Sequence, residues 1–271
     1  MVRAFLAGMV LVCVFAVSVP AQEKPLSSPR PLPVVETLDQ SELNLRFPFV
    51  KEDGWIQAPE AQDDSPSFQL DLPFTFPVFC QTRFHAWINN NGNLTFQREL
   101  ETWTPTPFPA GIEMVAPFWA DVDTRGQSAN NTPTGLVWYK YFDVDSDGQH
   151  DTLVVTWDHV GYYGVNAPHL DKLNTFQVAI SSVSLSGVPG ENVCFSYGDM
   201  QWTTGDVSPD RPDPDGFGGC GAVVGIDGGD NLNYVIYGPP GEPNGVWDSA
   251  QDLMSLAHTT LYFSTVRPSH N

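Results

Sequence analysis

The densest group of potential metal ligands is an acidic run between two apolar segments. It contains four carboxylates, at Asp143, Asp145, Asp147 and Asp151. Oxygen ligands at alternating positions suit Ca²⁺, and Gly148 permits the sharp turn that they need. With the backbone carbonyl of Gln149, these carboxylates predict one calcium site, because without a cation they would repel one another. Val154 stands where an EF-hand has its glutamate, so we expect a calcium loop between strands. The alternative is a plain hairpin turn.

A second acidic pair, Asp121 and Asp123, lies in the segment APFWADVDTR. Alternation along a strand places both carboxylates on the same side. Such a pair can act in acid–base chemistry or glycoside cleavage, but more often it accepts backbone N–H bonds or holds a structural ion. The loop 205–219 is a further candidate for cation binding, although we favour a stiff surface loop there. Its carboxylates are Asp206, Asp210, Asp213 and Asp215.

Common catalytic motifs are absent. The sequence contains no G-x-S-x-G, H-E-x-x-H, G-x-x-x-x-G-K-[ST] or Cys-x-x-Cys pattern, and its six histidines lack metal-ligand spacing. There are 12 Lys and Arg against 32 Asp and Glu, so the formal net charge is −20. This charge repels nucleic acid and anionic lipid. We therefore expect a non-enzymatic protein that does not bind nucleic acid.

Short apolar segments between turn residues must position these acidic groups. Gly (23) and Pro (24) are frequent and 12% of the residues are aromatic, which favours short strands over helices. Eleven segments have a strand pattern: 68–76, 85–88, 93–96, 113–122, 135–142, 152–157, 174–181, 193–202, 221–226, 234–238 and 260–266. Only 248–257 has a helical pattern, with Asp248 or Ser249 as its N-cap. The sequence predicts an all-β sandwich of about eleven short, mostly antiparallel strands, with one short helix near the carboxyl end.

The aromatic residues divide into core and surface candidates. Six occur in strand segments, where large rings fill a sandwich core: Trp87, Trp119, Trp138, Trp157, Phe176 and Trp202. Tyr162 and Tyr163 lie between two glycines in an expected turn. We therefore expect these two tyrosines to stay exposed and to be available for ligand binding, for example by stacking on a sugar.

The first 21 residues predict export. Arg3 precedes an apolar run of about 15 residues that ends in small residues at Val19 and Ala21. This run is shorter than the ~20 residues that span a bilayer, so we expect cleavage after Ala21 and no membrane span in the mature chain. The rest divides into an extended Pro/Ser-rich tether (22–44), the β-domain (45–267) and a tail (268–271).

Covalent modifications are expected at cysteines and asparagines. The mature chain keeps three cysteines, so at most one intrachain disulfide forms. If the runs that begin at Cys194 and Cys220 pair as a hairpin, these two cysteines lie too far apart to bridge. We therefore expect Cys80 to pair with Cys220 or Cys194. N-x-Thr sequons make Asn93 and Asn130 possible glycosylation sites.

Eight separated strings together resemble the nidogen-type extracellular (NIDO) domain family of nidogens, tectorin-like and mucin-like matrix proteins. In chain order they are FPF (47–49), WINNNGNLTF (87–96), VAPFWADVDTR (115–125), GLVWYKYF (135–142), LVVTWDHVGYYG (153–164), LNTFQVAI (173–180), FSYGDMQWTTGD (195–206) and GAVVGIDGGD (221–230). The resemblance implies a β-rich extracellular module for cell-matrix adhesion without catalytic residues. The acidity and the calcium-type loop look more like a secreted bacterial relative.

These observations predict a secreted, extracellular adhesion or matrix module that is not an enzyme and has a Ca²⁺-stabilised loop. Its expected partner is an extracellular-matrix or cell-surface protein or glycan. The alternative is a carbohydrate-binding or glycoside-cleaving β-sandwich, which a row of exposed aromatic rings would favour.

Overall fold

The computed structural model describes most of the β-domain. The described residues are 30–31, 45–48, 53–58, 64, 68–125, 135–208, 215–242 and 245–266. The expected signal peptide, the tail and Asn130 lie outside them. Within the described part of the chain, no helix combines the length and apolar character needed to cross a membrane.

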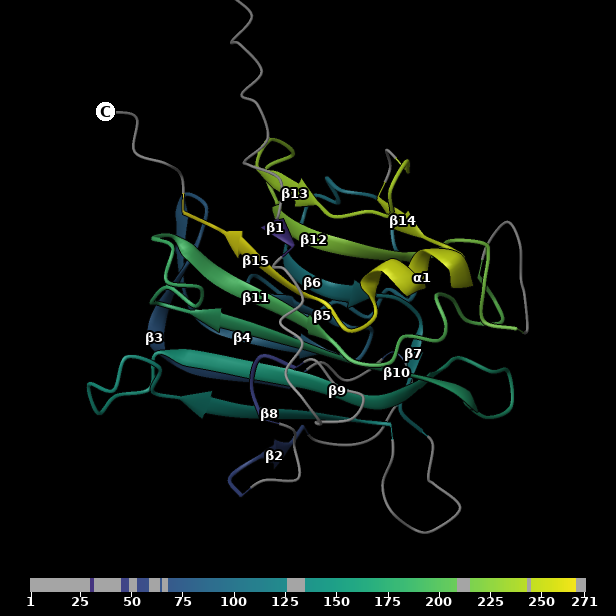
Figure 1. The fold of residues 1–271 in the computed structure, drawn as a ribbon, viewed down its shortest axis with the longest axis horizontal. Helices are drawn as coiled ribbons and strands as arrows, with labels where there is room; N and C mark the ends of the chain where they lie inside the picture. Colours follow the sequence, from purple (N-terminus) through teal and green to yellow (C-terminus); the bar gives the residue numbers. More distant parts are fainter. Residues whose placement is uncertain are drawn as a thin grey trace, which may run out of the picture.

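Two antiparallel sheets form a sandwich (Figure 1). Sheet A has the order β1 (Arg30–Pro31), β15 (Thr260–Ser264), β11 (Glu191–Tyr197), β10 (His169–Ser181), β9 (Thr152–Tyr162), β8 (Leu136–Phe142) and β2 (Ile56–Gln57), with β7 (Val122–Asp123) beside β9. Sheet B has the order β13 (Tyr234–Ile236), β12 (Ala222–Gly228), β6 (Glu113–Trp119), β5 (Asn93–Thr95), β4 (Gln81–Asn89) and β3 (Phe68–Val78), with β14 (Val246–Trp247) beside β12. The predicted all-β sandwich is confirmed.

The main core lies between the sheets and is rich in aromatic rings. The ring of Phe176 stacks on Trp157 at a centroid distance of 5.1 Å and meets Phe118 at 5.4 Å. Trp202 is buried in the same core, Trp119 is buried in a separate smaller cluster, and Trp87 and Trp138 are half-buried. Because each such ring buries roughly 150–250 Å², the strand aromatics stabilise the sandwich. They form no exposed row within the described residues.

All eleven predicted segments contain strand, and the helix is present as α1 (Ala250–Leu256). Its N-cap is Ser249, whose side chain accepts the N–H of Asp252. The sequence did not predict β1, β2 and β14, and it joined Val122 of β7 to the segment that forms β6. Each has only two residues, which is too short to show an alternating pattern.

The described residues before β3 contact sheet A at both edges and on its outer face. β1, within the expected tether, pairs with β15 at one edge. Phe47 is buried over the sheet, where its N–H donates to Gln177 Oε1 at 3.2 Å and its ring lies 5.0 Å from Phe142. β2 then pairs with β8 at the opposite edge. Phe47 and Trp55 therefore cover an apolar patch of the sheet.

The predicted disulfide is absent. Cys80 is exposed, Cys194 is buried and Cys220 is half-buried, and none of these three is in a disulfide bond. The runs that begin at Cys194 and Cys220 do not pair as a hairpin, because β11 belongs to sheet A and β12 to sheet B. Burial raises the pKa of the Cys194 thiol to about 12.

Candidate functional site

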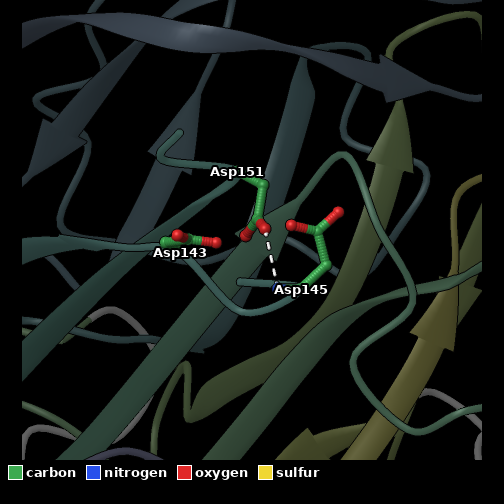
Figure 2. Close-up of side chains that lie close together, drawn as sticks. All are labelled: Asp143, Asp145 and Asp151. Atoms are coloured by element: carbon green, nitrogen blue, oxygen red, sulfur yellow. Dashed lines mark hydrogen bonds between the residues drawn. The ribbon is translucent and has the colours of Figure 1, made fainter. Parts of the chain in front are cut away.

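The β8–β9 turn brings three of the predicted calcium ligands together (Figure 2). Asp143, Asp145 and Asp151 each offer a carboxylate oxygen, and these oxygens lie within 4.8 Å of one another. Asp145 is exposed, whereas Asp151 is buried just before β9. The structure does not place Asp147 in this group: its carboxylate accepts the N–H of Gln149 at 2.8 Å. No contact places the Gln149 carbonyl among the ligands.

Hydrogen bonds within the turn orient these carboxylates. Asp151 Oδ2 accepts the N–H groups of Val144 and Asp145, at 3.0 and 3.2 Å, and Thr152 donates its hydroxyl to Asp151 Oδ1. Asp143 accepts the N–H of Gly148 at 2.9 Å. Gly148 has a φ of 91°, which glycine adopts without strain. The backbone therefore folds back and leaves the three acids facing one another.

The surroundings of Asp145 in this turn disfavour its ionised form. The pKa of the Asp145 carboxyl is raised above its usual value of 3.8. Local desolvation is the main cause, and the negative charges of Asp147, Asp151 and Asp143 add to it. A hard cation bound between the three carboxylates would relieve this repulsion.

The pair Asp121 and Asp123 lies at the other end of β9, next to β7. Asp123 is fully buried, and the guanidinium of Arg125 contacts both of its oxygens, with Nε at 2.9 and 3.0 Å. Asp121 is also buried, and its Oδ2 packs so closely on Gly205 that a Cβ there would lie 2.3 Å away. These contacts favour the structural interpretation of the pair over glycoside cleavage.

At the same end of the sandwich, two loops are joined by hydrogen bonds. We name them the clasped loops (163–169 and 203–208). His169 Nε2 lies 2.9 and 3.0 Å from the two carboxylate oxygens of Asp206, whose N–H donates to the Tyr163 carbonyl at 3.0 Å. The Arg125 guanidinium lies 5.4 Å from the centre of the Tyr163 ring and donates to the Gly164 carbonyl. No local pattern predicts this arrangement, because its members are distant in sequence.

The prediction that Tyr162 is exposed is wrong. Its side chain is fully buried, stacks on His169 at 4.5 Å and donates its hydroxyl to Asp171 Oδ1 at 3.2 Å. Burial, followed by the charge of Asp171, raises its pKa well above 10. The cause is that β9 continues through Tyr162, so strand alternation turns this ring toward Trp202, whereas Tyr163 remains half-buried.

The exposed apolar side chains at the clasped loops are aliphatic, not aromatic. Val165 is 61% exposed and Val207 is 46% exposed, and Leu170, at the adjoining start of β10, is 38% exposed. Of the acidic loop 205–219, Asp215 is exposed, whereas Asp210 and Asp213 lie outside the described residues.

Asn93, named above as a possible glycosylation site, is not accessible in the folded domain. Asn93 is fully buried, and its Oδ1 accepts from Asn89 Nδ2 at 2.8 Å. The neighbouring asparagines hold the corner between β6 and β7: Asn91 Oδ1 accepts the N–H of Val122, and Asn90 Nδ2 donates to the Val122 carbonyl. The asparagine run in the sequence is the signal for this buried polar network.

Comparison with known proteins assigns the family. A family model described as the nidogen-like domain, NIDO, matches residues 84–258. The chain belongs to the NIDO family. This NIDO chain is 31% identical to alpha-tectorin of Mus musculus over 212 residues, which cover 70% of the chain and 9% of that protein. It is 28% identical to nidogen of Drosophila melanogaster over 177 residues, which cover 58% of the chain and 12% of that protein.

The NIDO chain spans about a tenth of the length of these curated relatives. No solved structure matches it. The family match runs from β4 through α1, so it includes the asparagine run, the β8–β9 turn and both clasped loops. β3 and β15 lie outside the match, yet each completes part of a sheet.

Proposed function

We propose that this NIDO chain is a secreted, non-enzymatic module that attaches to proteins of the extracellular matrix or cell surface. Membership of the NIDO family and similarity to nidogen and alpha-tectorin support this function. The observation that carries it is the pair of clasped loops, which present exposed aliphatic side chains on a fixed framework. Loops that are already ordered lose less conformational entropy when they bind.

The negative charge of the chain favours a basic partner. Val165, Leu170 and Val207 offer apolar contact next to the carboxylates of Asp171 and Asp206. The net charge of −20 attracts a basic protein surface and repels an acidic one. We therefore propose a protein partner in which basic residues surround an apolar side chain.

Serine at both Val165 and Val207 is expected to weaken attachment about tenfold, because two exposed aliphatic contacts are lost. Surface plasmon resonance on immobilised basic matrix proteins measures this change. The matched control replaces Val188 and Leu232, which are exposed at other turns, with serine. Attachment should also fall as salt rises. Equal losses in the two double variants would contradict the proposed surface.

We also propose that the β8–β9 turn binds one Ca²⁺ through Asp143, Asp145 and Asp151. Three carboxylates directed at one point and the raised pKa of Asp145 support this proposal. Asp147 and the Gln149 carbonyl complete the predicted ligand set only if the turn rearranges around the ion. The turn and the clasped loops lie at opposite ends of β9, so calcium would stiffen the sheet far from the partner surface (Figure 1).

Calcium affinity is expected to fall as the pH is lowered from neutral toward 4. Protons compete with Ca²⁺ for carboxylates. Because the pKa of Asp145 is raised in the calcium-free fold, this competition begins at a higher pH than an ordinary aspartate would give. Isothermal titration calorimetry at several pH values measures the effect. An affinity that stays constant down to the usual pKa of 3.8 would contradict ligation by Asp145.

A further inference from the structure

A hollow of about 310 Å³ lies in sheet B, between the β3–β4 turn and the turn that follows β12. Val78 and Phe79, both almost fully buried, give it an apolar lining. Two glycines let the β12 turn approach: a Cβ on Gly228 would lie 2.8 Å from the Phe79 ring, and one on Gly229 would lie 2.8 Å from the Glu113 nitrogen. The hollow is therefore built into the packing of the two turns.

The charged side chains around this hollow are already balanced. Arg83 donates two hydrogen bonds to Glu113, at 2.6 and 2.5 Å, and Glu113 is only 1% exposed. The carboxylate of Asp230 accepts the N–H groups of Leu232 and Asn233 in its own turn, at 2.9 and 2.7 Å. An ionic ligand would have to compete with these contacts, so the hollow does not suit one.

The remaining polar groups are neutral. Gln81 and Gln97 are exposed side chains that line the hollow, and each primary amide can both donate and accept hydrogen bonds. A purely apolar ligand would desolvate these amides without replacing their hydrogen bonds. A neutral ligand with many hydroxyl groups and one apolar face satisfies the amides, and Phe79 can contact that face.

We propose that this hollow binds a single neutral sugar ring, as found at the end of a glycan chain. Its volume lies at the lower limit for small-molecule sites, which is enough for one ring but not for a long oligosaccharide. This binding activity goes beyond the proposed attachment to a protein, and it uses residues remote in sequence from the clasped loops.

The test titrates the full chain with a panel of free sugars, monitored by NMR chemical shifts. The panel contains glucose, galactose, mannose and N-acetylglucosamine, together with the charged sugars glucuronic acid and glucosamine. At least one neutral sugar is expected to bind with millimolar affinity. Gln81→Leu or Gln97→Leu should weaken that binding at least fivefold, while Gln251→Leu, at an exposed position of α1, should leave it unchanged.

A second measurement does not depend on variants. Cys80 is exposed and lines the same hollow, so a bound sugar should slow its alkylation by N-ethylmaleimide, as followed by mass spectrometry of the Cys80 peptide. The proposal is overturned if no neutral sugar binds, if a charged sugar binds more tightly, or if a sugar that binds leaves both the Cys80 rate and the glutamine dependence unaffected.

Discussion

Alanine in place of Gly92 is expected to lower the free energy of unfolding by about 3–5 kcal/mol. Gly92 has a φ of 77°, and a Cβ there would lie 1.9 Å from the Phe118 carbonyl oxygen and 3.2 Å from the Phe176 ring. Both contacts are backbone or core groups that cannot move freely. Because domains of this size are stable by roughly 5–15 kcal/mol, urea denaturation should show a large shift of the midpoint.

Gly187→Ala is the matched control for this prediction. Gly187 also has a positive φ, of 82°, but a Cβ there would meet nothing within 4 Å. It should therefore cost only the backbone strain of about 1–2 kcal/mol. If the two alanine variants are equally stable, the close approach of Gly92 to β6 does not contribute to the stability of the fold.

Asparagine in place of Asp145 is expected to change stability in opposite directions with and without calcium. With free Ca²⁺ at ten times its Kd, binding adds about 1.4 kcal/mol, which corresponds to a rise in Tm of roughly 3–6 °C. Asp145→Asn should lose most of this rise. In EDTA the variant should be at least as stable as the native protein, because the substitution removes one charge from a repelling cluster.

The proposed site also predicts how the stability of the calcium-free protein depends on pH. A raised pKa in the folded state means that the calcium-free native protein gains stability as Asp145 takes up a proton. The stability difference between native protein and Asp145→Asn in EDTA should therefore shrink as the pH falls toward 4. Asp71→Asn, which removes an exposed charge from β3, is the control. If neither calcium nor EDTA changes the Tm of the native protein, the calcium site is refuted.

Patterns within short segments predicted the strands well. All eleven predicted segments contain strand because alternation and turn residues are local properties. Tyr162 shows where this reasoning fails. Its flanking glycines suggested a turn, but the pairing of Tyr162 with His169 extends β9 by several residues and buries the ring. Pairing with the next strand, β10, decided the outcome.

The candidate site divides in the same way. Asp143, Asp145 and Asp151 are close in sequence, so their approach in one turn could be predicted. The contacts between His169 and Asp206, and between Arg83 and Glu113, join residues far apart in the chain. A single sequence does not show which distant strands and loops lie side by side, and therefore gives no means of predicting these contacts.

The central claim is that this NIDO chain attaches to extracellular proteins through its clasped loops. The most direct test is an array of purified matrix proteins and glycans probed with the full chain in Ca²⁺, in EDTA and at rising salt. The proposed function predicts attachment to basic matrix proteins that weakens in high salt and weakens about tenfold when Val165 and Val207 are both replaced by serine. Attachment to none of these proteins, or attachment that salt and both serine substitutions leave unchanged, would contradict it.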